Sequence, residues 1–301
     1  MTSPPAGGRA PLAAGLLCYT FWGLLPILFQ AAGRAGATPW EIVAWRIVWA
    51  VPCAALLVWA SRQGPKFWQL AARPADLAVL VLSAALISLN WLVYVWAVST
   101  HRTLEASLGY YINPLLNMAA GALMFRERIS RSGWIAIALA TAGVVLQAVA
   151  LGAPPWVSIV LALSFCSYGV VRKQAAADAQ TGLMVECLVV FIPAAAYAAW
   201  LAHKGVGHFG ASPTVTWLLL LGGPATVVPL AAFAWAARRL TLTVMGFLQF
   251  IAPTLQFIVG VENGEHLTPL RVASFGFIWA GVMVFAAGAW LRTRRLQPSA
   301  A

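Results

Sequence analysis

The chain has 301 residues, of which 61% are hydrophobic and only 9% are charged. A soluble domain carries about 25% charged residues, so this composition excludes an ordinary soluble protein and indicates a membrane protein. The net charge of +11 does not indicate a nucleic-acid partner, because the basic residues concentrate in loops on one side of the predicted membrane, beside anionic lipid.

Ten apolar stretches follow one another, each near the roughly 20 residues that a helix needs to cross a bilayer. Their hydrophobicity is continuous, whereas barrel strands would alternate and be about half as long. We therefore predict an all-α, polytopic membrane protein with ten transmembrane helices. The predicted spans are residues 11–32, 40–60, 76–98, 103–125, 131–150, 155–173, 182–201, 214–236, 242–262 and 270–291.

The basic residues predict the orientation of these spans. Of the 19 lysines and arginines, 14 fall on the side of the N-terminus and four on the opposite side, while Arg46 lies inside the second span. Cytoplasmic loops carry the excess of basic residues in membrane proteins. We therefore expect both termini in the cytoplasm.

The second half of the sequence resembles the first. At a shift of 138 or 139 residues, several positions correspond: Pro114 to Pro253, Asn117 to Gln256, Glu127 to Glu265, and Gly143 to Gly281. Because each copy would hold five spans, an odd number, the second copy must enter the membrane from the opposite side. We expect two inverted five-helix repeats, at residues 1–150 and 151–301, the second ending in a short basic tail.

Two prolines interrupt corresponding spans. Pro114 and Pro253 each lie near the middle of a predicted helix and free the backbone carbonyl four residues earlier, at Tyr110 and Gln249. Paired breaks of this kind often mark the binding site of a transporter with inverted repeats. A kink that serves only packing is the alternative for each proline alone.

One helix face of the fourth span is polar. Glu105, Gly109, Asn113 and Asn117 are spaced by four residues, so they form a stripe from about 3 Å to about 20 Å below the outer end of the span. Charge facing lipid is costly, so the stripe must face protein or water. Since Arg46 lies at a similar depth, we expect an ion pair between Arg46 and Glu105, direct or through water.

Two roles are open for Arg46 and Glu105. As a structural clasp, the pair would only neutralise two charges within the membrane. As a gate or coupling group, Glu105 would exchange Arg46 for a substrate cation or a proton, so proton coupling is permitted without being required.

Further polar and aromatic residues lie within the spans and could line a cavity. An interhelical hydrogen bond, or simple packing for the aromatic rings, is the alternative for each. With the stripe, the candidate cavity residues are Trp22, Asn90, Trp91, Tyr94, Tyr110, Asn113, Asn117, Tyr168, Gln249 and Gln256. Glu186 is a weaker candidate, which we expect to be interfacial or paired with Arg172 or Lys173.

No catalytic or metal-binding pattern stands out. The four cysteines fall within spans without paired spacing, and the two aspartates, Asp76 and Asp178, lie in predicted loops. We therefore expect no cofactor, no metal and no catalytic residues. An integral-membrane enzyme or a channel remains the alternative to a transporter.

Several segments together resemble a known family. They are AWRIVW at 44–49, LNWLVYVWAVSTHRTLEASLGYYINPLLN at 89–117, FRERIS at 125–130, SFCSYGVVRKQAAADAQTGLMVE at 164–186 and GFLQFIAPTLQF at 246–257. The sequence is similar here to RarD-type permeases, in the EamA branch of the drug/metabolite transporter superfamily. The resemblance implies two inverted five-helix halves in the bacterial inner membrane that move a small metabolite or drug by alternating access.

From the residues and the resemblance together, we expect a secondary-active or facilitative transporter. Its substrate would bind in a central cavity between the two repeats, with membrane lipid around the helices. The short connections at 99–103 and 237–241, equivalent on opposite faces, would serve as hinges of two gates.

Overall fold

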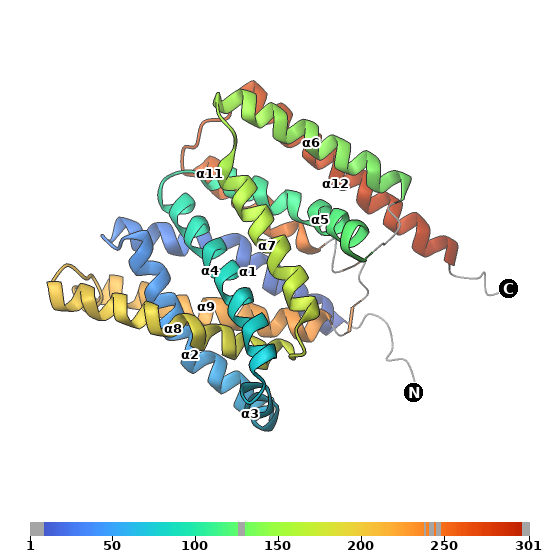
Figure 1. Cartoon of the computed structure of the whole chain (residues 1–301). Coiled ribbons are helices and arrows are strands. Elements are labelled where there is room, and N and C mark those ends of the chain that lie inside the picture. The colour runs from blue at the N-terminus through green and yellow to red at the C-terminus, as the bar shows by residue number, and fades with distance from the viewer. Residues whose placement is uncertain (1–8, 126–129, 238, 241–243, 245–247, 297–301) are drawn as a thin grey trace.

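The computed structural model describes residues 9–125, 130–237, 239–240, 244 and 248–296, and the regular structure in these residues is helical (Figure 1). The helices are α1 (Arg9–Arg34), α2 (Pro39–Ala60), α3 (Gly64–Ala71), α4 (Pro74–Ser99), α5 (Thr103–Phe125), α6 (Arg131–Leu151), α7 (Trp156–Gln174), α8 (Ala179–Lys204), α9 (Pro213–Ala237), α11 (Ile251–Glu262) and α12 (Pro269–Leu296). The predicted spans therefore match the observed helices closely, apart from the ninth span.

Among the described residues, seven helices are long and apolar enough to cross a membrane, namely α1, α2, α4, α6, α8, α9 and α12, while α7 and α11 are shorter apolar helices. Large apolar side chains also lie on the outside of the bundle, including Leu56, Ile192 and Met283, each more than 60% exposed. Such a surface requires lipid around it. The chain is an all-α, multi-pass membrane protein.

The helix ends follow from local sequence. The helices α2, α4, α9 and α12 each begin at a proline, a position where the missing backbone N–H costs nothing. Thr38 caps α2, and its hydroxyl accepts a hydrogen bond from the N–H of Glu41 at 3.2 Å. Gly152 and Gly205 end α6 and α8 with left-handed backbone angles.

Two features differ from the predicted spans. The short helix α3 was expected as a loop, because its eight residues cannot cross a bilayer and carry little periodic signal. In the ninth span, Leu248 and Gln249 are helical, Phe250 lies in a turn, and α11 begins only at Ile251. Five residues of that predicted span, 242–243 and 245–247, lie outside the described chain.

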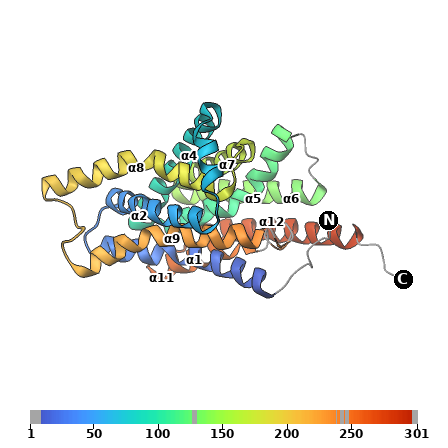
Figure 2. The same ribbon diagram turned by 90° about the horizontal axis from the view of Figure 1, so that it is seen from below.

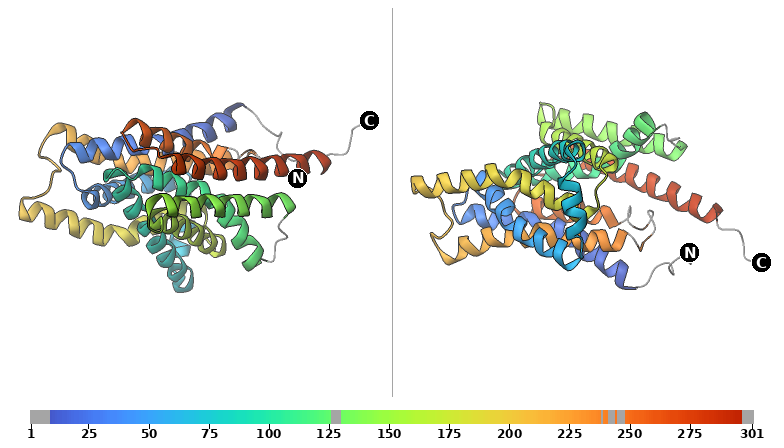
Figure 3. Two further views of the ribbon diagram at one scale, coloured as in Figure 1. Left: turned by 90° about the horizontal axis from the view of Figure 1, so that it is seen from above. Right: turned by 60° about the horizontal axis from the view of Figure 1, so that its bottom comes forward.

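The helices form two groups. The larger group contains α1, α2, α4, α5, α7, α8, α9 and α11, with α2 packed against α8 and α9, α4 against α7, and α1 against α9 and α11. The helices α6 and α12 form a pair beside this group and contact it mainly through α5 (Figures 1 and 3).

Two glycines let α6 and α12 approach closely. A Cβ atom on Gly143 would lie 2.8 Å from the carbonyl oxygen of Ser274, and one on Gly281 would lie 2.9 Å from that of Ala136. The hydroxyl of Ser274 donates to the carbonyl of Gly143 at 2.7 Å. Because position 143 faces 274 while 136 faces 281, the two helices run antiparallel.

The bundle has two distinct ends. The beginning of α1 and the end of α12 lie at the same end, on the right in Figures 1 and 2, which we call the terminal end. The connection between α8 and α9 lies at the other end, which we call the opposite end.

Candidate functional site

Arg46 lies about 10 Å from the start of α2 and is only 5% exposed. Its Nε donates a hydrogen bond to the hydroxyl of Thr226 on α9 at 2.7 Å. The guanidinium carbon lies 4.5 Å from the ring centre of Trp91 and 5.5 Å from that of Phe29. Its Nη1 has no hydrogen-bond partner among the residues that the structure describes.

Close packing of α9 on α2 positions this arginine. A Cβ on Gly222 would lie 3.1 Å from both Cα and Cβ of Arg46, and one on Gly223 would collide with the backbone of Trp49. Thr226 in turn donates to the carbonyl of Gly222 at 2.9 Å, which fixes its hydroxyl toward Arg46. No local pattern marks Thr226 as a partner of Arg46, because it lies 180 residues later in the chain.

Asn90 joins three helices beside Arg46. Its amide donates to the carbonyl of Leu161 at 2.9 Å and to the hydroxyl of Ser164 at 3.0 Å, both on α7. Its amide oxygen accepts from the hydroxyl of Tyr110 on α5 at 2.9 Å. The alternative of an interhelical hydrogen bond is therefore confirmed for Asn90, and this buried side chain makes three.

Aromatic rings connect Asn90 and Arg46. The rings of Tyr94 and Tyr110 lie 5.5 Å apart, and those of Phe29 and Tyr94 lie 6.1 Å apart, in both cases edge to face. The hydroxyl of Tyr94 is buried and finds no hydrogen-bond partner in the described part of the chain. We call this group the central cluster; it comprises Phe29, Arg46, Asn90, Trp91, Tyr94, Tyr110 and Thr226.

Several other predicted cavity residues do not belong to the central cluster. Trp22 packs against Phe233, and its carbonyl accepts from the amide of Gln256 at 3.3 Å, which ties α11 to α1. The amide oxygens of Gln256 and Asn113 are buried without a partner within the described ranges, and Gln249 is half-buried. The side chains of Pro114 and Asn117 lie outside the described residues, whereas Pro253 is buried near the start of α11.

The predicted direct ion pair between Arg46 and Glu105 is wrong. Glu105 instead pairs with Arg102, Nε to Oε1 at 2.7 Å and Nη2 to Oε2 at 2.9 Å. Arg102 also lies over the rings of Trp96 and Trp156. The depth of two residues in a membrane does not say which way each faces, and an arginine three residues before Glu105 reaches it from the same helix end.

Glu186 belongs to a second buried group, which we call the Glu186 cluster. Its carboxylate lies 3.4 Å from Nε of Arg172 and accepts hydrogen bonds from the hydroxyls of Ser83 and, at 3.4 Å, Tyr168. The expected pairing with Arg172 is confirmed. Tyr168 therefore lies with Glu186 rather than in the central cluster, and Ser83 gave no signal in the sequence.

The arginine of this cluster needs a glycine beside it. A Cβ on Gly182 would collide with the guanidinium of Arg172. Arg172 and Glu186 are 15% and 3% exposed, so the pair is well shielded from solvent. The cluster joins α4, α7 and α8.

Two acidic residues close the opposite end. Glu41 accepts from the backbone N–H of His208 at 2.6 Å, and its other oxygen lies 2.8 Å from Nδ1 of the same residue. Trp45 stacks on Phe209 with ring centres 3.8 Å apart. Glu265 accepts from the backbone N–H groups of Thr103 and, at 2.9 Å, Leu104, and so caps α5.

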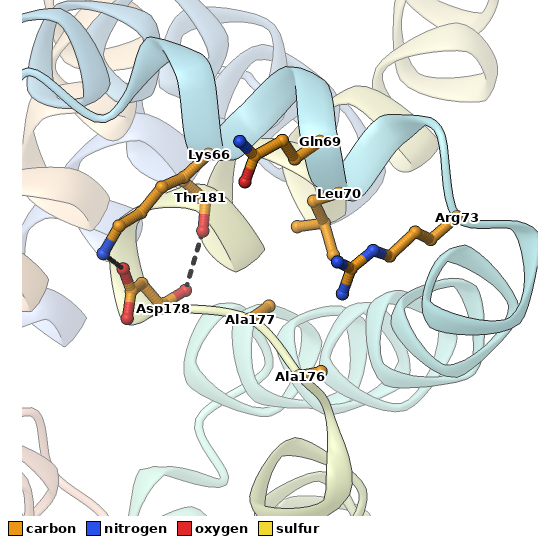
Figure 4. A pocket seen from close by; sticks show the side chains of 8 residues that line it. All are labelled: Lys66, Gln69, Leu70, Arg73, Ala176, Ala177, Asp178 and Thr181. Atoms are coloured by element: carbon orange, nitrogen blue, oxygen red, sulfur yellow. Dashed lines mark hydrogen bonds and ion pairs between the residues drawn. The ribbon is translucent and has the colours of Figure 1, made fainter.

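The terminal end is held by more exposed groups. Lys66 on α3 pairs with Asp178, before α8, at 2.7 Å, and the amide of Gln63 donates to that of Gln180 at 3.1 Å. Lys66 and Asp178 border an open pocket of about 370 Å³, which Figure 4 shows between Lys66, Arg73 and Asp178. A second pocket, of about 360 Å³, lies at the opposite end beside His101 and Arg271.

The predicted hinges are described only in part. Between α4 and α5, His101 has a positive φ of 56°, and the N–H of Arg102 bonds to the carbonyl of Ala97 at 2.8 Å. In the second predicted hinge, 237–241, residues 238 and 241 lie outside the described chain. Within the described ranges, no three histidine, cysteine or acidic side chains gather as metal ligands.

Comparison with known proteins identifies the family. The EamA-like transporter family matches residues 10–149. An uncharacterized transporter of Pseudomonas aeruginosa is 42% identical over 96% of this chain and 98% of its own length. The protein RarD of Escherichia coli is 37% identical over 95% of this chain and 97% of its own. The chain belongs to the EamA-like transporter family.

Further relatives agree with this assignment. The chloramphenicol-sensitive protein RarD of Pseudomonas aeruginosa is 33% identical over 96% of this chain and 95% of its own. One solved crystal structure superposes with a TM-score of 0.60 over 97% of this chain and 100% of the other at 18% identity, which establishes likeness of fold alone. This EamA-like protein is a transporter and not an enzyme.

Proposed function

We propose that this EamA-like transporter carries a small organic solute, a metabolite or drug, across the bacterial inner membrane by alternating access. The observation that carries the proposal is the central cluster. It is buried, polar and aromatic, and it joins Arg46, Asn90 and Tyr110 from residues 1–150 with Thr226 and Ser164 from residues 151–301. A substrate bound there would lie between two halves that can move against each other.

The helix contacts support an inverted repeat. If α1, α2, α4, α5 and α6 correspond in order to α7, α8, α9, α11 and α12, the contact of α1 with α9 becomes that of α7 with α4. The same exchange turns α1 with α11 into α7 with α5, and α2 with α9 into α8 with α4; all these pairs are in contact. The pairs α2 with α8, α5 with α11 and α6 with α12 map onto themselves and are also in contact.

The glycines of α6 and α12 support the same relation at the level of residues. A shift of 138 carries Gly143 to Gly281 and Ala136 to Ser274. It therefore exchanges the contact of Gly143 with Ser274 for that of Gly281 with Ala136, which are the two closest approaches of these glycines to backbone oxygens. A two-fold axis in the membrane plane between the halves accounts for this reciprocity.

Separate contacts at each end provide two gates. At the opposite end, Glu41 and Glu265 each bind backbone N–H groups of the other half. At the terminal end, Lys66 pairs with Asp178, and Ser83 donates to Glu186. Releasing one set while keeping the other would expose the central cluster to one side only.

Within this proposal, the predicted residues take different parts. Trp22 accepts a hydrogen bond from Gln256, which ties α1 to α11. The amide oxygens of Asn113 and Gln256 have no partner among the described residues and are offered to a substrate. Glu105, held by Arg102, belongs to the gate at the opposite end, and Tyr168 belongs with Glu186 to the gate at the terminal end. The excess of basic residues supports a cytoplasmic terminal end.

Disulfide cross-links test the gates. In a variant lacking Cys18, Cys53, Cys166 and Cys187, the pair Glu41→Cys with His208→Cys would lock the opposite end, and Lys66→Cys with Asp178→Cys would lock the terminal end. A reporter, Thr226→Cys, would then react with an impermeant thiol reagent from the unlocked side only. Reactivity from both sides, with either end locked, would contradict alternating access.

Transport itself is measured in proteoliposomes. Uptake of a pooled panel of metabolites and drugs, followed by mass spectrometry with and without a pH gradient, should reveal a solute whose uptake stops on oxidation of either cysteine pair and returns on reduction. Accumulation only with the gradient would indicate proton coupling, and equilibration without it a facilitator. Currents far above carrier rates would indicate a channel instead.

A further inference from the structure

Arg46 is a buried cation without a neutralising carboxylate in the described chain. Seven of the eight acidic residues of the sequence lie in that part. Five of the seven carboxylates lie beside a basic side chain: Glu41 beside His208, Asp76 beside Arg73, Glu105 beside Arg102, Asp178 beside Lys66, and Glu186 beside Arg172. Glu265 accepts hydrogen bonds from the backbone of Thr103 and Leu104, and Glu262 is exposed at the end of α11. None of these seven carboxylates forms an ion pair with Arg46.

The groups that do contact Arg46 are neutral. Thr226 accepts one hydrogen bond from Nε, and the rings of Trp91 and Phe29 offer their π faces. Such rings attract a cation but leave the net charge and the remaining N–H donors uncompensated. Nη1 is buried and has no hydrogen-bond partner in the described chain.

Burial of an unpaired charge inside a membrane protein is expensive, so such residues generally serve a function. A guanidinium offers two parallel N–H donors that match the two oxygens of a carboxylate or phosphate. A second unsatisfied donor lies in the same cluster. Tyr94 is 3% exposed, and its hydroxyl lacks a hydrogen-bond partner in the described chain.

We propose that Arg46 binds the anionic head group of the transported solute, a carboxylate or a phosphate, and that the rings of Trp91, Tyr94 and Tyr110 contact its apolar body. The proposal rests on the carrier function above and names its substrate class. The solute replaces the missing carboxylate and neutralises the buried charge when it binds. The direct pair with Glu105 that depth alone suggested is thereby replaced by a pair with the substrate.

Ligand binding to the purified protein tests this proposal without requiring transport. The probes are phenylacetate and phenyl phosphate, with phenylacetamide and phenethylamine as neutral and cationic matches of similar shape. We expect a saturable rise in thermal stability with at least one of the two anions and none with the amide or amine. Comparison of phenylacetate with phenyl phosphate tells which head group fits.

The variant Arg46→Gln should weaken binding of the stabilising anion about ten-fold or more, because a charge-assisted hydrogen-bonded pair is lost. It should fold at least as stably as the unsubstituted protein without ligand, since it removes an uncompensated charge. Arg239→Gln is the matched control, because Arg239 also lies over a tryptophan ring, that of Trp235, but is exposed. This control should bind the anion unchanged.

Several outcomes would overturn the proposal: no stabilisation by either anion, equal stabilisation by phenylacetamide, or undiminished anion binding in Arg46→Gln. If the proteoliposomes transport only neutral or cationic solutes, the carrier function stands and the anionic substrate class fails. If anions bind through Arg46 but the cross-linked ends do not control uptake, the binding site stands and alternating access fails.

Discussion

Glu41 reaches across the bundle to His208, accepting the backbone N–H of that residue with one oxygen and lying beside its ring nitrogen with the other. The Glu41 side chain is 1% exposed, although Glu41 lies in the first turn of α2, near the surface. Because it also accepts the N–H of Phe209 at 3.3 Å, it holds the connection between α8 and α9 in place.

Replacement Glu41→Ala should therefore loosen this connection. It leaves backbone donors without an acceptor, which costs about 1 to 3 kcal/mol for a buried group. Hydrogen exchange should accelerate at residues 205–212 and little elsewhere. Glu262→Ala, at an exposed acidic position, is the control; equal exchange in both variants would show that Glu41 does not hold the connection.

Lys66 and Asp178 should contribute much less. Their side chains are 63% and 38% exposed, and exposed ion pairs contribute about 0 to 1 kcal/mol because water and salt screen them. Lys66→Ala should shift the thermal midpoint far less than Glu41→Ala, measured side by side in the same detergent. A larger shift for Lys66→Ala would mean that this exposed ion pair contributes more to the stability of the fold than Glu41 does.

Gly182→Ala should disrupt the Glu186 cluster. The added methyl would collide with the guanidinium of Arg172 and force it away from Glu186. Separating a buried pair costs about 3 to 5 kcal/mol, and the remaining exposure of Arg172 places the expected loss toward the lower figure. Gly276→Ala, where no atom lies within 4 Å of the added methyl, should be nearly neutral.

Substitution of a glycine at the contact between α6 and α12 should lower the stability of the protein by a similar amount on either helix. Gly143→Ala and Gly281→Ala each place a methyl within 3 Å of a backbone oxygen, and overpacking typically costs about 1 to 3 kcal/mol. Gly33→Ala, with open space around it, is the control. The free energies of unfolding of the two single variants and of the double variant measure the coupling between Gly143 and Gly281. A large loss of stability for one glycine alone would contradict the reciprocal packing.

Much of the fold was predictable from hydropathy and helix-starting prolines. The ends of α2, α5 and α6 agree with the predicted spans to within one residue, because each hydrophobic run is bounded by polar or basic residues or, at the end of α6, by Gly152. The correspondence of Gly143 with Gly281 was also visible in the sequence. The short helix α3 was missed, since eight residues cannot form a recognisable span.

The site was predicted less well, for a geometric reason. Hydropathy gives the depth of a residue but not the neighbour it faces, so Glu105 was paired with Arg46 rather than Arg102. The hydroxyl that does bind Arg46 belongs to Thr226, 180 residues away, where nothing local marks it. Asn90 and Tyr110 were found because polar groups inside an apolar span need partners, whatever those partners are.

The separate position of α6 and α12 has a consequence for biosynthesis. The main partner of α6 is the last helix of the described chain, so α6 enters the membrane more than a hundred residues before α12 is made. Until then, the glycine-bearing face of α6 must contact lipid or a membrane chaperone. Docking of α12 is therefore a late step of assembly. A chain truncated before Pro269 should still form a nearly complete binding site in the membrane, with α6 unpaired beside it.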